Sequence, residues 1–386
     1  MIKSIKLFPE EKIMKNAFRC YASAAFGMEG LVASELKQLG FESAKAENGG
    51  VLFDADADEI MRCNLYSRFS DRIYLLLSDT ECRTFEELYQ AVFRIDWENY
   101  CFQDAAINIS CKCVRSALMS MRDCQSVAKK AILNRLHEKN GQTFFPESGA
   151  PLPVHLSVRN DRLRILLNTS GDALSRRGYR TWNGEAPLRE TLAAALVELS
   201  PWKPDRPLHD PCCGTGTLLI EAAFAASGRA PGLRRPFAME KIKCFARHDL
   251  SGIRNAAELA YQPDRIGSVS GSDIDREALS LASRHVRQAC LPESSIRLSC
   301  TPLQELNLKE ENGVFLCNPP YGERLSDQAH CRKLYRDLHN LRLRHPSWSL
   351  CAISSDPAFE RSYGQRADKK RRLYNGRLEC VFYIYR

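Results

Sequence analysis

The residues with the most specific chemistry are Asn318, Pro319, Pro320 and Tyr321, which directly follow the apolar run 314–317. Proline fixes the backbone and has no N–H, so the two prolines hold a rigid carbonyl beside the Asn318 side-chain oxygen. This pair of acceptors matches the two hydrogens of an exocyclic amine on a base. Tyr321 can stack on that base, which contributes roughly 1–3 kcal/mol. The run predicts a catalytic site at the carboxyl end of a strand, where open α/β sheets bind ligands.

A second candidate site is the glycine turn within residues 208–221, between a short apolar run and a helical run. Gly214 and Gly216 let the backbone approach a ligand closely, and the next helix would direct its N-terminus at that ligand. Asp210 would repel a diphosphate, but it suits a cationic amine such as the α-amino group of S-adenosylmethionine. The alternative is a tight strand-to-helix turn that binds no ligand. The position of Asp210, four residues before Gly214, favours a ligand-binding turn.

An acidic pair follows the next predicted strand. Asp273 stands where such folds bind ribose hydroxyls, whereas Asp275 is predicted to cap the helix that starts at Arg276. The long separation of Gly216 from Asp273 requires an insertion, which contains Pro231-Gly232. The predicted cofactor-binding residues are Asp210, Cys213, Gly214, Thr215, Gly216, Asp273, Ile274 and Asn318.

Three segments must position these residues. From about residue 181, strands at 268–272, 296–299, 314–317, 350–354 and 378–385 alternate with helices at 217–226 and 276–289. This order predicts a mostly parallel sheet covered on both faces. Residues 18–80 alternate strand and helix as a ferredoxin-like fold does. Residues 84–168 form another α+β unit, with helices at 85–93 and 125–136 and a hairpin around Asn160-Asp161.

Composition sets the class. The chain of 386 residues is 44% hydrophobic, long enough for two or three globular domains. It contains no apolar run of the ~20 residues that span a membrane, and residues 1–16 lack the apolar core of a signal peptide. We therefore expect a cytoplasmic location. None of the sixteen cysteines forms a Cys-x-x-Cys pair, so we expect reduced thiols and no metal site.

The net charge of +8 fits a polyanionic partner without requiring one. Basic residues gather in the middle segment and near the C-terminus, and either group could instead be a solvated face. In the C-terminal group, the stretch 373–376 could be a β-hairpin whose charges only solvate a sheet edge. The residues predicted to contact RNA phosphates are Lys112, Arg115, Lys129, Lys130, Lys369, Lys370, Arg371 and Arg372.

The sequence resembles the THUMP-domain class I RNA methyltransferases, similar to the bacterial 23S rRNA guanine-N2-methyltransferase group. The likeness rests on Ala24–Gly30, on Asp123–Lys130, on Arg177-Gly-Tyr-Arg180, on Asp210–Glu221 and on Asn318–Leu325. It implies a ferredoxin-like domain at 17–80, a THUMP RNA-binding domain at 81–170 and a Rossmann-like, seven-stranded catalytic domain at 181–386. It also implies S-adenosylmethionine as the cofactor, and 23S rRNA or a ribosome assembly intermediate as the partner.

The chain departs from this family at the predicted adenine contact, where Pro302 replaces the usual Asp and leaves the contact unassigned. Three other functions stay open. An adenine-N6-methyltransferase acting on DNA or RNA uses the same acceptor motif, as does a protein glutamine-amide methyltransferase. A non-catalytic RNA-binding assembly factor could keep the fold, although the intact motifs argue against it.

Overall fold

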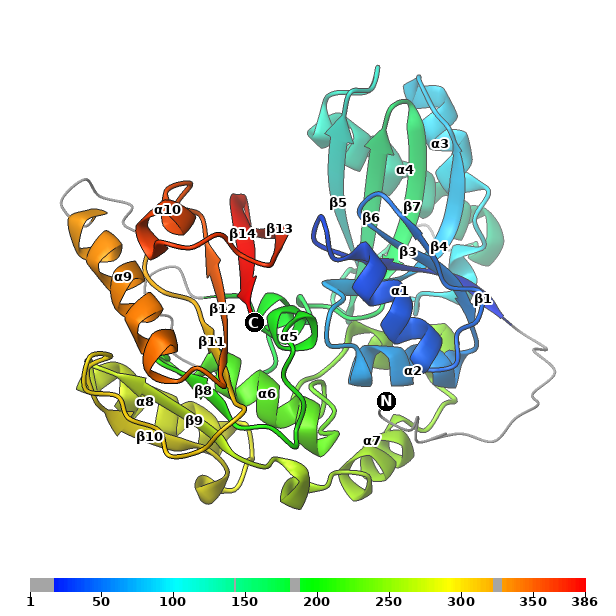
Figure 1. The fold of residues 1–386 in the computed structure, drawn as a ribbon. Coiled ribbons are helices and arrows are strands. Elements are labelled where there is room, and N and C mark those ends of the chain that lie inside the picture. Colours follow the sequence, from blue (N-terminus) through cyan, green and yellow to red (C-terminus); the bar gives the residue numbers. More distant parts are fainter. Residues whose placement is uncertain (1–16, 142–143, 181–187, 322–327) are drawn as a thin grey trace. The chain divides into compact units, whose positions relative to one another are not determined.

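The computed structural model describes residues 17–141, 144–180, 188–321 and 328–386 and contains two compact units (Figure 1). The first unit comprises Met1–Ala24, Val32–Leu174 and Pro236–Arg254. The second comprises Ala25–Leu31, Ser175–Arg235 and Asn255–Arg386. The charged segment 1–16, expected not to be a signal peptide, lies outside the described residues. No helix among the described residues is both long and apolar enough to cross a membrane.

One seven-stranded sheet forms the centre of the first unit, in the order β2-β3-β1-β4-β7-β6-β5. β5 and β6 run parallel, and the other neighbours are antiparallel. β4 pairs with both β1 and β7, so the two N-terminal modules predicted from the sequence share a continuous sheet. The strands are β1 (Phe18–Ser23), β2 (Lys45–Glu47), β3 (Gly50–Ala55), β4 (Arg72–Glu81), β5 (Ala106–Val114), β6 (Pro151–Arg159) and β7 (Arg162–Asn168).

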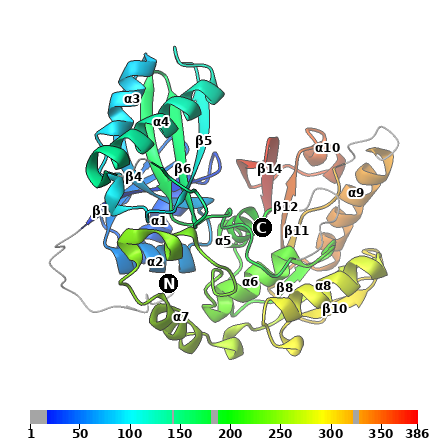
Figure 2. The ribbon, with the colours of Figure 1, turned by 180° about the vertical axis from the view of Figure 1, so that it is seen from behind.

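Capping residues and turn residues define the ends of these elements. Asp56 and Thr84 each form a capping box with a glutamate three residues later. Asn160 and Asp161 adopt φ values of +51° and +59° in the predicted hairpin between β6 and β7, a conformation that Asn and Asp tolerate better than most residues. Helices α3 and α4 lie side by side (Figures 1 and 2). The α-helices are α1 (Glu29–Gln38), α2 (Ala57–Tyr66), α3 (Phe85–Phe93) and α4 (Met121–Asn140).

The second unit has a sheet in the order β10-β9-β8-β11-β12-β14-β13. The first five strands are parallel, and β14 and β13 close the sheet as an antiparallel hairpin. β11 and β12 are buried on both faces, as expected for a covered parallel sheet. The strands are β8 (Leu208–Asp210), β9 (Val269–Asp273), β10 (Arg297–Cys300), β11 (Val314–Cys317), β12 (Ser349–Ser354), β13 (Lys369–Asn375) and β14 (Leu378–Tyr385).

Helices complete the second unit. The apolar stripe of α9 packs with aromatic residues of α10 and with β11 and β12 in one buried core. The predicted insertion between Gly216 and Asp273 contains short helices, and its part Pro236–Arg254 belongs to the first unit. The α-helices are α5 (Glu190–Leu199), α6 (Thr217–Ser227), α7 (Leu250–Leu259), α8 (Arg276–Gln288), α9 (Gln328–Arg344) and α10 (Phe359–Tyr363). The 3-10 helices among the described residues are η1 (Trp97–Asn99), η2 (Ala238–Lys241), η3 (Lys243–Phe245), η4 (Pro263–Arg265) and η5 (Glu293–Ser295).

Candidate active site

Three neighbouring parallel strands of the second unit end in the predicted site residues. Asp210 is the last residue of β8, Asp273 is the last residue of β9, and Asn318 directly follows β11. Because β8 lies between β9 and β11 in the sheet, all three residues stand at the same carboxyl edge. Ligands of open α/β sheets bind at this edge.

Asp210 is a buried carboxylate, with only 2% of its surface exposed. Its Oδ1 accepts a hydrogen bond of 3.0 Å from the Cys212 backbone N–H. Burial raises the pKa of Asp210 well above its usual range, and the nearby Asp273 adds to the increase. An acid in this position gains most from a cationic ligand, because a positive charge offsets the cost of burying the ionised form.

The glycine turn between β8 and α6 is held by three separate contacts. Gly214 N–H donates to Asp273 Oδ2 over 2.8 Å, and Cys213 N–H donates to the Ser272 carbonyl over 3.0 Å. A His285 ring nitrogen lies 3.1 Å from the Thr215 carbonyl. Gly214 and Gly216 both have positive φ, as the tight turn requires. The predicted residues Cys213 to Gly216 thus form one ordered loop against the end of β9.

Asp275 has the structural role expected of it. Its side chain caps α8 by accepting from the backbone N–H groups of Glu277 and Ala278. Asp273 Oδ1 in turn accepts from the Asp275 N–H over 3.0 Å. Asp273 is therefore fixed by two backbone donors, which orients its remaining lone pairs.

A cavity of about 320 Å³ lies at the same edge of the sheet. Three predicted site residues line it, namely Asp273, Ile274 and Pro320. Asp210, Cys213 to Gly216, and Asn318 with Pro319 and Tyr321 are not among its lining residues. The sequence did not indicate the rest of the wall, which is Pro211, Cys212, Thr301, Leu303, Gln304, His330, Lys333, Leu334 and Asp337.

The Asn318-Pro-Pro-Tyr run is held by two tyrosines. The Tyr335 hydroxyl of α9 donates to the Pro320 carbonyl over 3.0 Å. The Tyr321 hydroxyl donates to Asn318 Oδ1, so one lone pair of the proposed acceptor is already in use. Burial raises the pKa of Tyr321, which keeps it a neutral donor. An amide oxygen has a second lone pair that can accept another hydrogen bond.

A buried ionic network supports α6 behind the glycine turn. Arg177 pairs with Glu221 over 3.4 Å, and both side chains are at most 2% exposed. The Tyr179 hydroxyl donates to the same glutamate, and Arg180 donates to Thr217 Oγ1 over 2.6 Å. Sequence reasoning assigned these residues no role, although the resemblance included Arg177 to Arg180. Their contacts place them as supports of the helix that follows the turn.

Gly271 should be intolerant of a side chain. A Cβ at this position of β9 would lie 2.5 Å from Leu219 Cδ1 and 2.9 Å from Cys213 Cβ. We expect Gly271→Ala to displace the glycine turn and to lower the free energy of unfolding by about 1–3 kcal/mol, measured by urea denaturation. Gly30→Ala is the control, because its Cβ would meet nothing within 4 Å. Equal midpoints for parent and Gly271→Ala would contradict the close packing.

The predicted RNA-binding residues fall into two groups. Three residues of the first group are exposed: Lys112 on β5, Arg115 directly after β5, and Lys130 on α4. The fourth, Lys129, forms an ion pair of 2.8 Å with Glu147. The C-terminal residues Lys369, Lys370, Arg371 and Arg372 lie on the edge strand β13. Three of these β13 residues have partners on other elements. Lys370 pairs with Glu360 of α10, Arg372 pairs with Glu379 of β14, and Arg371 donates to the Gly27 carbonyl.

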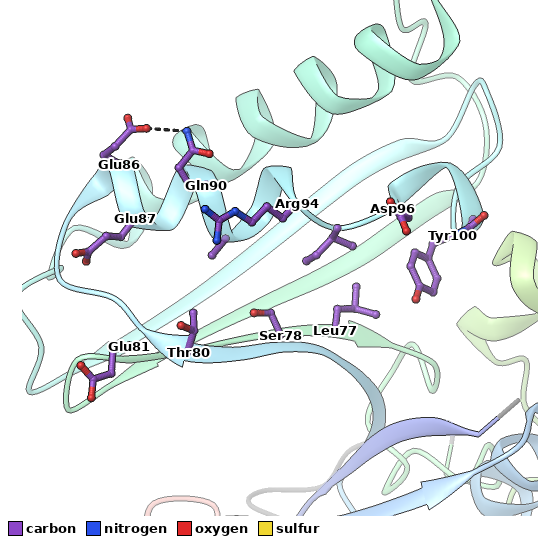
Figure 3. Close-up of a pocket in the computed structure, with 13 residues that line it drawn as sticks. Leu77, Ser78, Thr80, Glu81, Glu86, Glu87, Gln90, Arg94, Asp96 and Tyr100 are labelled. Carbon is purple, nitrogen blue, oxygen red and sulfur yellow. Dashed lines mark hydrogen bonds between the residues drawn. The ribbon is translucent and has the colours of Figure 1, made fainter.

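The first unit also contains a cavity of about 630 Å³ between β4 and α3 (Figure 3). Its wall includes Glu81, Glu86, Glu87 and Asp96 but only one basic residue, Arg94. Figure 3 shows the three glutamates gathered at one end. An acidic wall of this kind repels phosphate, so the cavity does not suit a nucleic-acid backbone.

Three family models match consecutive parts of the chain. An RlmL ferredoxin-like domain matches residues 19–74, a THUMP domain matches 82–168, and an RMKL-like methyltransferase domain matches 177–384. A relative from Bacillus subtilis, provisionally named RNA methyltransferase YpsC, is 36% identical and covers 94% of both chains. The ribosomal RNA large subunit methyltransferase K/L of Desulfotalea psychrophila is 32% identical over 95% of this chain. The present chain spans about half, 52%, of that longer relative.

Two solved structures have closely similar folds. A Listeria monocytogenes protein, described as a predicted N6-adenine-specific DNA methylase, has a TM-score of 0.92 and 37% identity, covering 98% of this chain and 99% of its own. SMU.472, provisionally called a methyltransferase and complexed with SAH, has a TM-score of 0.89 and 37% identity, covering 96% and 98%. The expected fold class is confirmed: a ferredoxin-like module and a THUMP module precede a Rossmann-like, seven-stranded methyltransferase domain. The chain belongs to the THUMP-domain class I RNA methyltransferases, with a catalytic domain of the RMKL-like family.

Proposed function

We propose that this chain transfers a methyl group from S-adenosylmethionine to the N2 amine of a guanine in 23S rRNA. The proposal rests on Asn318-Pro-Pro-Tyr, which directly follows the carboxyl end of β11. There it lies beside the acidic ends of β8 and β9. The longer relatives are named as ribosomal RNA methyltransferases, and the THUMP module supports RNA as the substrate.

The residues at this edge fit S-adenosylmethionine. The buried Asp210 has a backbone N–H as its hydrogen-bond partner and would pair with the α-amino group. Asp273 lines the cavity and would accept from the ribose hydroxyls. Gly214 and Gly216 place no side chain at two positions of the turn. The Cys213 N–H contacts the Ser272 carbonyl of β9, and the Thr215 carbonyl contacts His285 of α8. When bound, this cofactor supplies an electrophilic methyl group on a sulfonium.

The chain's own contribution to the reaction is positioning. The target base must leave its helix to reach the Asn318 amide, as it does in other enzymes that act on bases. Asn318 Oδ1 and the Pro319 carbonyl would accept from the two amine hydrogens and fix the nitrogen for in-line attack. Tyr321 would stack on the base, which requires its hydroxyl to leave Asn318. No strong base is needed before transfer, because the amine loses its proton to solvent afterwards.

Adenine N6 in DNA or RNA is the second candidate target. The Listeria protein of similar fold is described as an adenine-specific DNA methylase, and Asn-Pro-Pro-Tyr serves any exocyclic amine. Deleting the gene and mapping modifications in 23S rRNA tests the guanine proposal. We expect loss of one N2-methylguanosine. Unchanged rRNA together with a lost N6-methyladenine would favour the second candidate.

The basic residues of α4 should contribute a salt-dependent affinity for RNA. Each lost phosphate contact flattens the slope of log affinity against log salt by roughly 0.7–0.9, the values for single-stranded and duplex nucleic acid. We expect the double variant Lys129→Ala, Lys130→Ala to flatten the slope by about one contact, mainly through Lys130, because Lys129 pairs with Glu147. Fluorescence anisotropy on an rRNA fragment at several salt concentrations measures the slope.

The matched control for this double variant replaces Lys37 and Lys45, two exposed lysines of the same unit, with alanine. Cofactor binding should not change in either variant. Equal slopes for the parent and the Lys129, Lys130 variant would remove these two α4 lysines from the RNA-binding surface.

A further inference from the structure

Three cysteine thiols converge in the first unit. Cys111 and Cys113 lie two residues apart on β5, so both side chains point to the same face of the strand. Their Sγ atoms are 3.6 Å apart. Cys124 comes from the first turns of α4, and its sulfur completes a group in which all three atoms lie within 4.8 Å of one another.

The separations suit a thiophilic ion. Zinc binds thiolate at about 2.3 Å in a tetrahedral arrangement, which places two ligand sulfurs roughly 3.8 Å apart by that geometry. The Cys111 and Cys113 sulfurs are already near this spacing. The Cys124 sulfur lies at most 4.8 Å from the other two, so a shift of about 1 Å brings it to the same spacing.

The surrounding elements hold the three thiols in place. Ser120 caps α4 through the Asp123 N–H, and the Gln125 side chain donates to the Ile109 carbonyl of β5 over 3.0 Å. Cys124 is buried, whereas Cys111 and Cys113 are half-buried. An ion bound to the three sulfurs would therefore keep one position open towards solvent.

We propose that Cys111, Cys113 and Cys124 form a zinc-binding site with three thiolate ligands and one open position. Zinc bonds form to the three sulfurs as their protons leave to solvent. The ion would link β5 to the start of α4. The segment that contains Arg115 connects these two elements. The site lies in the first unit and uses none of the residues of the candidate active site.

The test uses the full chain, purified with a reductant and freed of metal. Titration with Co²⁺ reports thiolate ligation directly, through intense sulfur-to-metal absorption in the ultraviolet and tetrahedral bands in the visible. Competition with a chromophoric chelator then gives the zinc affinity. We expect one ion per chain. We expect Cys124→Ser to weaken zinc by more than the ~10–100-fold that loss of an outer-shell partner costs.

Two further variants separate ligation from folding. Cys111→Ser removes a half-buried ligand and should lose zinc in the same way while circular dichroism shows a folded chain. Cys244→Ser removes a half-buried thiol of the same unit outside the cluster and should keep parental affinity. Zinc should also raise the melting temperature of the parent but not that of Cys111→Ser. Absence of the Co²⁺ thiolate band, or equal zinc affinity in parent and both ligand variants, would overturn the proposal.

Discussion

Replacing Asn318 with alanine should lower the single-turnover rate of methyl transfer by about 10²–10³-fold, the range seen when one polar group aimed at a reacting atom is removed. The variant loses the side-chain acceptor but keeps the rigid Pro319 carbonyl. RNA affinity should stay nearly parental, because the amide acts on the reacting amine rather than on the RNA backbone. Rapid-quench measurement of methyl transfer at saturating cofactor gives the rate.

Asn318→Asp is the informative companion, since it keeps an oxygen acceptor at the same position. We expect it to retain more activity than Asn318→Ala. Tyr321→Phe removes the hydroxyl that donates to Asn318 in the structure and keeps the ring that stacks, so it should remain active. A parental single-turnover rate for Asn318→Ala would show that the proposed acceptor role is wrong.

The second large effect concerns the cofactor. Asp210→Ala should weaken binding of S-adenosylmethionine by roughly 2–5 kcal/mol, because it removes a buried partner of a cation. Asp210→Asn should show much of the same loss, although its side-chain oxygen can still accept from the Cys212 N–H. Isothermal titration calorimetry measures both, with Asp205→Asn as an exposed carboxylate control five residues away.

Affinity should also depend on pH through Asp210. Burial raises the pKa of this carboxyl, and only the ionised form attracts the α-amino cation. Cofactor affinity should therefore increase as pH rises through the raised pKa, and Asp210→Asn should lack this increase. An unchanged affinity in Asp210→Ala would place the cofactor away from the end of β8.

Strong local signals made several elements predictable. β11 and β14 have the predicted bounds because their apolar runs and alternation are uninterrupted, and α3 has them because Thr84 caps it. α9 was missed because its buried stripe is only Cys331, Tyr335, Leu338 and Leu341 in an otherwise polar helix. β13 lies in a basic run, and a hairpin at 373–376 was one of two interpretations of that run, since an edge strand can carry many charges.

The site shows the same contrast. Its motifs were predicted to follow strands, and the fold makes these strands neighbours, so that the motifs share one carboxyl edge. Gln304 and Asp337 line the cavity and share a hydrogen bond of 2.6 Å, yet they come from a loop and from α9, so only the fold brings them together. The group of three thiols was not predicted, because the search for closely spaced cysteine pairs along the sequence could not bring Cys124 of α4 next to Cys111 and Cys113 of β5.

The domain bounds 17–80, 81–170 and 181–386 remain a prediction. The compact units take Ala25–Leu31 and Pro236–Arg254 from distant parts of the sequence. Such exchanges depend on tertiary packing, which local patterns do not encode. Met239 and Phe245 of the second segment are buried, so their apolar character alone was compatible with either unit.

Methylation of an exocyclic amine in RNA by the Asn318-Pro-Pro-Tyr site can be tested directly. The most direct measurement incubates the chain with methyl-labelled S-adenosylmethionine and either unmodified 23S rRNA or duplex DNA, followed by digestion and identification of the labelled nucleoside. We expect label in RNA as N2-methylguanosine, and far slower labelling by the Asn318→Ala control. Label confined to DNA as N6-methyladenine, or binding of cofactor without any transfer, would contradict it.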